Sequence, residues 1–205
     1  MTAAGAPPRV PFLQGARVRL EPIAESDIPE NVRGANDPDV RHYARAWFPV
    51  TIEARNRQRV ENLEIGQKSD SIVFVIKLPD EVRPVGVVSL NSISWVDRNC
   101  WLGLAIGDKA KWGMNIAVEA GSLVLDYAFG ELGLHKVITG IFQPNTRSQR
   151  AAAKVGFVLR GIRKEHIFVD GKFVDAFTFE LMRDDWIKNR AKVHAMFRQS
   201  EGDKS

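Results

Sequence analysis

A basic, glycine-containing segment lies between an apolar run and a helical pattern in the middle of the chain. Residues 101–106 have the length and hydrophobicity of a buried strand, and Gly107 follows them. From Ile116 to Tyr127 the apolar residues recur at the spacing of one face of an amphipathic helix. A helix that begins after such a loop presents unpaired N–H groups and the positive end of its dipole. The residues near Gly113 therefore predict a site for phosphate oxygens.

Few other residues suggest chemistry by their type. Cys100 is the single cysteine, which excludes an internal disulfide and any multi-cysteine metal site. It has no evident histidine partner to activate it, so covalent cysteine catalysis is not expected. His135 is expected to begin a strand, and Glu119, within the helical pattern, is expected to be structural. We predict no metal site.

Length and composition indicate one globular domain. The chain has 205 residues, of which 44% are apolar and 26% charged. Its net charge of +4 suits an anionic ligand such as a polyphosphate, but the basic residues are dispersed, so nucleic-acid binding is not favoured. No apolar run approaches the roughly 20 residues that cross a bilayer, and no signal-peptide pattern occurs, so we expect a cytoplasmic protein without a membrane partner. The expected divisions are a flexible leader (1–14), a single domain (15–199) and a polar tail (200–205).

The strands that must position the central loop follow from apolar patterns bounded by turn residues. Three consecutive strands, ending with residues 101–106, are joined by short turns. This indicates an antiparallel meander, because a parallel pair needs a crossover of about a dozen residues. A whole helix precedes residues 135–142, so this strand can lie parallel to residues 101–106. The expected strands are residues 16–23, 71–78, 85–93, 101–106, 135–142, 157–169 and 173–182.

Capping residues and glycines mark the expected helices. Ser26 and Asp27 offer N-caps to the first helix, whereas residues 36–38 signal a turn and residues 40–50 are expected to form a loop. The fold class is therefore α/β (α+β), a mixed, mostly antiparallel sheet of about seven strands with one parallel junction, flanked by helices. The expected helices are residues 26–35, 51–66, 116–133, 145–155 and one that starts near residue 184.

Three blocks of sequence carry a resemblance to a known family. They are AIGDKAKWGMNIAVEA, LGLHKVITGIFQPNTRSQRAAAKVGF and GIRKEHIFVDGKFVDAFTFELMRDDW. In this order and spacing they resemble the GNAT acetyltransferases over about residues 16–186, and within them the RimJ/RimL-like branch that acetylates ribosomal-protein N-termini. The resemblance implies the GNAT fold, with a splayed parallel junction. It also implies direct transfer of acetyl from acetyl-CoA to a primary amine of a protein N-terminus or a small molecule.

The resemblance implies a binding site for the acyl-CoA at that junction. Backbone amides of the central loop would hold the pyrophosphate, and Ala105 and Ile106 would pair with the pantetheine. Asn145 is either a helix N-cap alone or also a pantetheine contact, and both interpretations stay open. The implied cofactor-binding residues are Ala105, Ile106, Lys111, Trp112, Gly113, Met114, Asn115, Ile116, Ala117, Asn145 and Ser148.

The chain departs from the family pattern at three positions. Asn115 stands where the family usually has a second glycine, but asparagine tolerates positive φ better than other non-glycine residues. Ala110 replaces an Arg or Gln of the phosphate loop. Ala152 replaces the tyrosine that serves as an acid in many members. We expect the first two departures to affect affinity for CoA.

Acyl transfer from a thioester needs a neutral amine and stabilisation of the tetrahedral oxyanion. An α-amino group of pKa near 7.8 is about one-seventh neutral at pH 7, so a general base is optional for it and nearly indispensable for a lysine-like amine. The resemblance implies that Ser148 stabilises the leaving sulfur; the alternative is that Ser148 is an ordinary serine in the first turn of a helix. It also implies that Glu165 is a general base; the alternative is that Glu165 is a solvated carboxylate on a strand. The backbone N–H of Ile106 would hold the oxyanion.

The acceptor amine would bind among residues 22–36, residues 43–50 and the closing hairpin. An aromatic cluster either lines that site or belongs to the core and a homodimer surface; its members are Tyr43, Trp47, Phe48 and Trp95. Three alternatives stay open. They are a CoA-binding sensor or structural protein with little catalysis, an acyltransferase that uses succinyl-CoA, and a basic RNA or ribosome binder.

Overall fold

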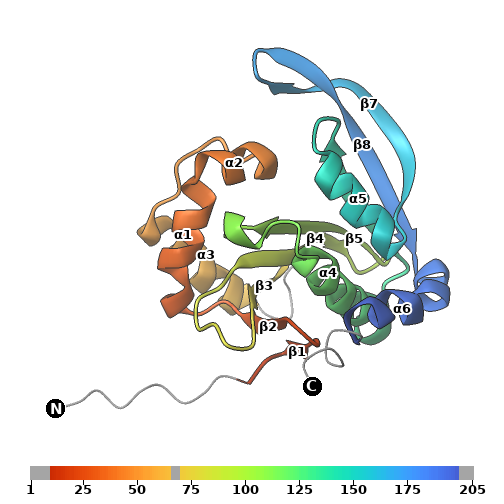
Figure 1. Ribbon diagram of the computed structural model, residues 1–205, viewed down its shortest axis with the longest axis horizontal. Helices are drawn as coiled ribbons and strands as arrows, with labels where there is room; N and C mark the ends of the chain where they lie inside the picture. Colours follow the sequence, from red (N-terminus) through yellow and green to blue (C-terminus); the bar gives the residue numbers. More distant parts are fainter. Residues whose placement is uncertain (1–9, 66–69, 199–205) are drawn as a thin grey trace.

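The computed structural model describes residues 10–65 and 70–198, and within these ranges one eight-stranded mixed sheet forms the centre of the protein (Figure 1). The strand order is β1-β2-β3-β4-β5-β6-β8-β7, and only β5 and β6 are parallel. The predicted mixed sheet with one parallel junction is confirmed, with eight strands in place of about seven. The strands are β1 (Leu13–Gln14), β2 (Arg19–Pro22), β3 (Ile72–Lys77), β4 (Gly86–Ser94), β5 (Asn99–Ile106), β6 (Lys136–Phe142), β7 (Val158–Val169) and β8 (Lys172–Met182).

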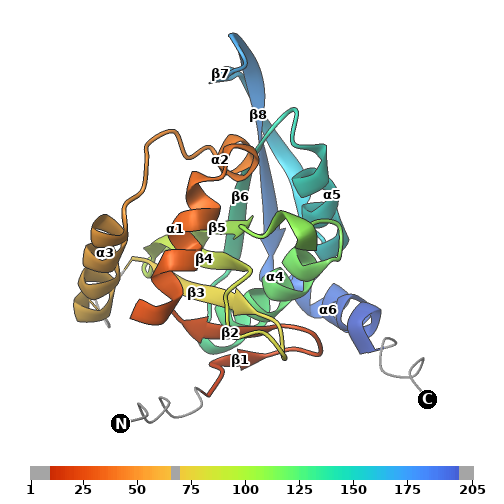
Figure 2. The ribbon, with the colours of Figure 1, turned by 60° about the vertical axis from the view of Figure 1, so that its left-hand side comes forward.

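Helices cover both faces of the sheet, as expected. Figure 2 shows α1 and α3 on one face and α4, α5 and α6 on the other. The main core lies beside α4 and α6, and the predicted face of α6 is buried there through Trp186, Val193 and Phe197. No helix within the described ranges is long and apolar enough to cross a membrane. The helices are α1 (Ile28–Asn36), α2 (Pro38–Ala44), α3 (Ile52–Ile65), α4 (Ile116–Asp126), α5 (Thr146–Val155) and α6 (Arg183–Arg198).

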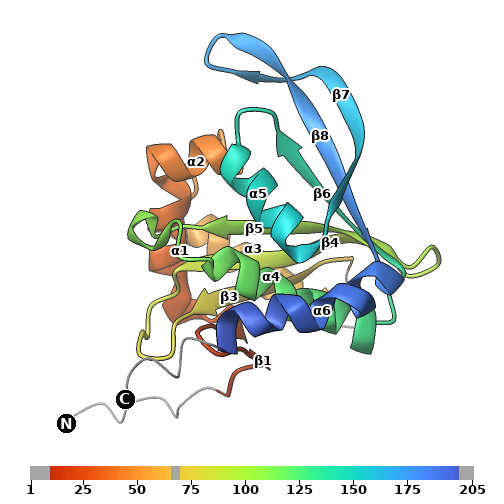
Figure 3. The same ribbon diagram turned by 45° about the vertical axis from the view of Figure 1, so that its right-hand side comes forward.

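The two parallel strands separate after a short paired stretch. β5 pairs with β6 only through Asn99–Trp101 and Lys136–Ile138. The Thr139 hydroxyl then donates to the Leu102 carbonyl at 3.1 Å, and beyond this contact the strands diverge, as Figure 3 shows. Divergence leaves one edge of β5 without a neighbouring strand. The candidate active site lies at this gap.

The prediction of a loop over residues 40–50 is wrong in its first half, because α2 (Pro38–Ala44) occupies it. The Asp37 carboxylate accepts hydrogen bonds from the N–H groups of Asp39 and Val40 at 3.0 and 3.2 Å, and a proline stands at the first helical position. Both features start helices as readily as turns. The residues that predicted a turn therefore begin a helix.

Two further expectations near the N-terminus are wrong in part. Leu13 and Gln14, assigned to the leader, form β1 against β2. Asp27 stands at the N-cap position of α1, as predicted, but its carboxylate does not cap the helix, because it accepts from the Ala24 N–H at 2.9 Å and pairs with Lys77 at 2.8 Å. Residues 1–9 of the leader and the tail 200–205 lie outside the described residues, so the remaining domain boundaries stay predictions.

The hairpin of β7 and β8 extends well beyond the body of the protein (Figure 1). Its tip contacts α2 and the residue after it. The Arg45 guanidinium donates to the Phe168 carbonyl at 3.2 Å, and the His42 Nδ1 lies 3.8 Å from the Asp170 carboxylate. The hairpin thereby reaches back over the gap between β5 and β6.

Candidate active site

A cavity of about 330 Å³ opens where β5 and β6 separate. Its walls are the end of β5, the loop after it, and parts of α2, α4 and α5. Among the residues predicted to bind the cofactor only Met114 does not line it, with a side chain 51% exposed. The structure thus brings together residues from two separate sequence blocks. The predicted residues that line the cavity are Ala105, Ile106, Lys111, Trp112, Gly113, Asn115, Ile116, Ala117, Asn145 and Ser148.

The loop before α4 depends on two residues with positive φ. Gly113 has a φ of 84°, and Asn115, the N-cap of α4, has a φ of 59°. The expected tolerance of asparagine at this position is therefore confirmed. The Asn115 side chain accepts a hydrogen bond from the Lys154 ammonium at 2.8 Å, so the departure from glycine adds a contact to α5. The first turn of α4 starts directly behind this loop.

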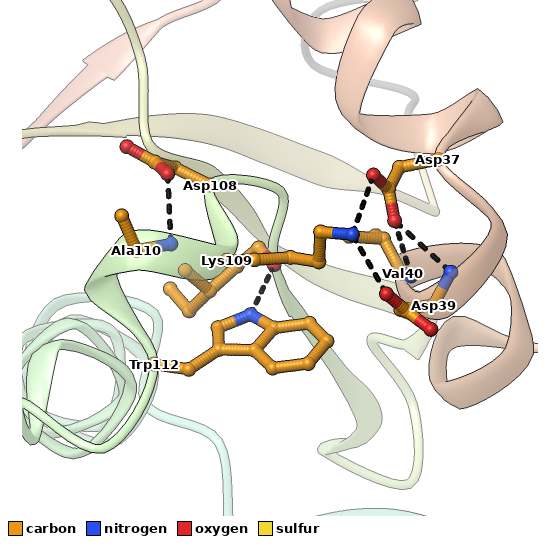
Figure 4. Close-up of polar contacts among 8 residues, drawn as sticks. Asp37, Asp39, Val40, Asp108, Lys109, Ala110 and Trp112 are labelled. Carbon is orange, nitrogen blue, oxygen red and sulfur yellow. Dashed lines mark hydrogen bonds and ion pairs between the residues drawn. The ribbon is translucent and has the colours of Figure 1, made fainter.

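Polar contacts fix the loop to its surroundings (Figure 4). Lys109 bridges Asp39 at 2.7 Å and Asp37 at 3.0 Å, which joins the loop to α2. Hydrogen bonds from Asp39 and then Asp37 raise the pKa of Lys109, and the Lys109 ammonium lowers the pKa of Asp37. The Trp112 indole donates to the Ile106 carbonyl at 2.9 Å.

The cations of the cavity come from α5 more than from the loop. Lys111 pairs with Glu81 at 2.6 Å, and Lys109 is already bridged to carboxylates. The residues Arg147, Arg150 and Lys154 line the cavity from α5, at positions i, i+3 and i+7 of one helical face. These three residues were not among those predicted from the sequence, although their spacing within the second block could have identified them.

An aromatic pair holds one of these cations in place. The Arg147 guanidinium carbon lies 3.7 Å from the centre of the Trp112 ring and 4.9 Å from that of Tyr43. Cation–π contacts of this kind fix the direction of an arginine without neutralising it. The cavity therefore presents a positive group at its mouth between α2 and α5.

Backbone geometry leaves the Ile106 N–H directed into the gap. The Gly107 N–H donates to the Val85 carbonyl at 2.9 Å. Directly opposed residues in an antiparallel ladder alternate between hydrogen-bonded and non-hydrogen-bonded pairs, so the next pair, Gly86 with Ile106, is non-hydrogen-bonded. The N–H and C=O groups of Ile106 therefore point away from β4, toward the side from which β6 diverges. Those of Ala105 point toward β4. Pantetheine pairing by Ala105, as the resemblance implies, does not fit this register.

The two side chains predicted to act in catalysis lie apart. Ser148 lines the cavity in the first turn of α5, where its N–H donates to the Asn145 side chain at 3.1 Å, so Asn145 is a helix N-cap. Glu165 lies exposed in β7 with a φ of 47°, and its N–H donates to Asp175 at 3.0 Å. It does not line this cavity or the one described next. The structure therefore brings Ser148, and not Glu165, to the gap.

A second cavity of about 300 Å³ lies on the opposite face of the sheet, under α1 and α3. It shares Val40, Ala44 and Ala105 with the first cavity, so the two meet at the end of β5. Parts of the expected acceptor segments line it, namely residues from 22–36 and from 43–50. The closing hairpin does not line this cavity, whereas α3, which was not among the predicted acceptor segments, does.

The aromatic cluster is divided between the first cavity and the surface. Tyr43 lines the first cavity, whereas Trp47, Phe48 and Trp95 are exposed and line neither cavity. Burial raises the pKa of the Cys100 thiol to about 12, which leaves it neutral and unreactive. Within residues 10–65 and 70–198, no cluster of three or more His, Cys, Asp or Glu residues could hold a metal ion.

Comparison with known proteins identifies the family. A family model described as the acetyltransferase (GNAT) domain matches residues 17–158, more than half of the chain. The chain belongs to the GNAT acetyltransferase family. The resemblance seen in the three sequence blocks is confirmed, and with it the GNAT fold. The protein is an N-acetyltransferase that uses acetyl-CoA as its co-substrate.

The matches to GNAT relatives cover most of the chain. This chain is 29% identical to a probable N-acetyltransferase, YjcK, from Bacillus subtilis over 85% of this chain and 98% of that protein. It is 26% identical to the [ribosomal protein uS5]-alanine N-acetyltransferase of Escherichia coli over 73% of this chain and 80% of that protein. The spermidine N-acetyltransferase from Vibrio cholerae, solved in complex with CoA and spermine, has a similar fold, with a TM-score of 0.74 at 19% identity over 84% of this chain and 99% of that one.

Proposed function

We propose that acetyl-CoA binds in the first cavity and that the acceptor amine enters from the second. The observation that carries this proposal is the meeting of the two cavities at Ala105, next to the backbone of Ile106. A donor on one side of β5 and an acceptor on the other would place the thioester and the amine in direct contact there. Transfer then occurs in a ternary complex, without an enzyme-bound acetyl group.

Charge in the first cavity supports the proposed position of the phosphates. The helix α4 begins behind the loop at Gly113, and its free N–H groups and dipole favour anions. The side chains of Arg147, Arg150 and Lys154 add positive charge from α5. Lys111 and Trp112 would border the pyrophosphate. Asn145 would support this arrangement by capping α5, and Met114 would contact the ligand only at the edge.

The proposed reaction joins the amine nitrogen to the acetyl carbon and breaks the carbon–sulfur bond. The Ile106 N–H would stabilise the oxyanion of the tetrahedral intermediate. The Ser148 hydroxyl would donate a hydrogen bond to the departing sulfur, and the amine proton would end on the thiol. Glu165 as a general base stays a prediction without support from its position. An α-amine, which is partly neutral at pH 7, is the acceptor that needs such a base least.

We further propose that the acceptor is the α-amine of a protein N-terminus or a small-molecule amine. The uS5-alanine acetyltransferase relative supports the first class, and the spermidine acetyltransferase fold neighbour is consistent with the second. A cytoplasmic location and a homodimer are part of this proposal. They are motivated by the single cysteine and by exposed aromatic residues such as Phe48.

Release of thiol from acetyl-CoA tests the proposed function. The acceptors are α-amino peptides, polyamines and aminoglycosides, with succinyl-CoA as a second donor. A Ser148→Ala variant should lower kcat with little change in the KM for acetyl-CoA, and Thr146→Ala, at an exposed position of the same turn, serves as the control. Full turnover by Ser148→Ala removes the role proposed for its hydroxyl. CoA binding without turnover on any acceptor would favour a sensor.

A further inference from the structure

Two arginines of the second cavity have guanidinium nitrogens without partners. Arg55 and Arg59 lie one turn apart on α3, are partly buried, and line this cavity. The Nε atom of each is buried and has no hydrogen-bond partner in the described part of the chain. Arg55 donates from Nη1 to the neutral Gln58 amide on the same helix at 2.7 Å. Neither arginine forms an ion pair with a described carboxylate.

The carboxylates of this cavity are occupied elsewhere. Glu30 pairs with Arg33, whose Nε donates to it at 2.9 Å, and this hydrogen bond lowers the pKa of Glu30. Asp108 accepts a hydrogen bond from the Ala110 N–H at 3.0 Å and caps the short helical turn after β5. Burial, in contrast, lowers the pKa of Arg55. The cavity therefore has cationic donors in excess.

A buried cationic donor without a partner is unfavourable, and a bound anion removes that cost. Guanidinium groups match carboxylates closely, because their N–H groups form two parallel hydrogen bonds with the two oxygens. We propose that the acceptor amine of this enzyme carries a carboxylate, which Arg55 and Arg59 bind while its amino group lies beside Ala105. This inference rests on the function proposed above, since it names the substrate class of the same site.

The shape of the cavity limits the size of such an acceptor. The cavity runs from α3 to the end of β5, so the carboxylate and the amine would lie at opposite ends of it. A volume of about 300 Å³ is at the small end for ligand sites. The acceptor is therefore a molecule of amino-acid size or the first residues of a peptide. A polyamine has no oxyanion and would bring more positive charge to the two arginines.

The test measures kcat/KM for matched acceptors at saturating acetyl-CoA. One pair is a free amino acid and its amide, and the other is a peptide amide beginning with Glu and its counterpart beginning with Gln. We expect kcat/KM to be at least tenfold higher for the carboxylate than for its uncharged counterpart in one of the two pairs. A preference in the amino-acid pair identifies the acceptor as a small molecule, and a preference in the peptide pair identifies it as a peptide. Spermidine should be poorer than the carboxylate acceptor.

Variants of α3 connect the preference to the two arginines. In Arg55→Gln/Arg59→Gln the ratio of kcat/KM for the carboxylate acceptor to kcat/KM for its amide should fall at least tenfold. Arg57→Gln is the matched control, because Arg57 is exposed on the same helix and does not line the cavity. Equal use of both members of each pair by the wild type, or a preference that survives in the double variant, overturns the proposal.

Failure of this inference is distinguishable from failure of the proposed function. Without a thermal shift by CoA and without turnover, the proposed function fails. With CoA binding and turnover but no carboxylate preference, only the present inference fails. If CoA binds and no acceptor turns over, the same pairs are compared by thermal shift of the CoA-bound protein. Equal shifts by the carboxylate and the amide then overturn it.

Discussion

Substitution of Gly86 by alanine tests how closely β4 and β5 approach each other at the gap. A Cβ atom there would lie 2.4 Å from the Ala105 carbonyl oxygen and 3.0 Å from the Ile106 Cα, both backbone atoms. The first distance is about 1 Å short of ordinary contact, so β5 must move. Strain of this kind costs about 1–3 kcal/mol, which for a chain of this size lowers Tm by about 2–12 °C. A shift of this size beside the proposed reacting atoms should lower kcat by on the order of 100-fold.

Gly121→Ala is the matched control, since a Cβ at this buried position of α4 would meet only the Leu104 side chain at 4.0 Å. Loss of unfolded-state freedom should stabilise that variant by about 0.4–1 kcal/mol, with activity retained. Thermal unfolding and thiol release measure both effects. A Gly86→Ala protein with wild-type Tm and kcat would refute the close approach of β4 to the Ala105 carbonyl and the dependence of catalysis on the position of β5.

Three more outcomes follow from the described contacts. Asn145→Ala removes the cap of α5 and should lower the free energy of unfolding by about 1 kcal/mol and Tm by a few °C. Thr146→Ala, at an exposed position, should leave Tm unchanged, and equal Tm values for the two variants would show that the cap contributes nothing. Cys100, fully buried and with a pKa of about 12, should react with a thiol reagent at pH 8 only after unfolding, and rapid labelling of the native protein would contradict its burial. Because Lys109 lowers the pKa of Asp37, their interaction should stabilise the fold above the ordinary aspartate value of 3.8 and be lost as pH falls through the lowered pKa. In Lys109→Gln, NMR titration should find the Asp37 pKa nearer its ordinary value, and an unchanged pKa would exclude the bridge.

Elements with strong local patterns were predictable from the sequence. β3, β4 and β5 have apolar stretches closed by turn residues, and the short turns between them allow only antiparallel pairing. The α2 segment was not predictable in this way, because Asp37 followed by proline begins turns and helices alike. Burial of Val40 and the bridge from Lys109 distinguish the two outcomes, and both depend on residues distant in sequence. β1, at two residues, is too short to show a period.

The first cavity was largely predictable, since its loop and α4 carry family motifs. Its cations on α5 and the direction of the Ile106 N–H were not, because they depend on how α5 packs and on the register between β4 and β5. The second cavity was only partly predictable. Nothing in the polar sequence of α3 shows that Arg55 and Arg59 are partly buried beside β4, since exposed helices carry the same residue types.

The helix α2 is a wall of both cavities, through Val40 and Ala44, and Lys109 ties it to the loop before α4. A ligand in either cavity therefore restricts the same helix. With acetyl-CoA in one cavity and the acceptor in the other, as proposed, the acceptor must change the affinity for acetyl-CoA by the same factor by which acetyl-CoA changes the affinity for the acceptor. The apparent dissociation constant of each substrate then depends on the concentration of the other.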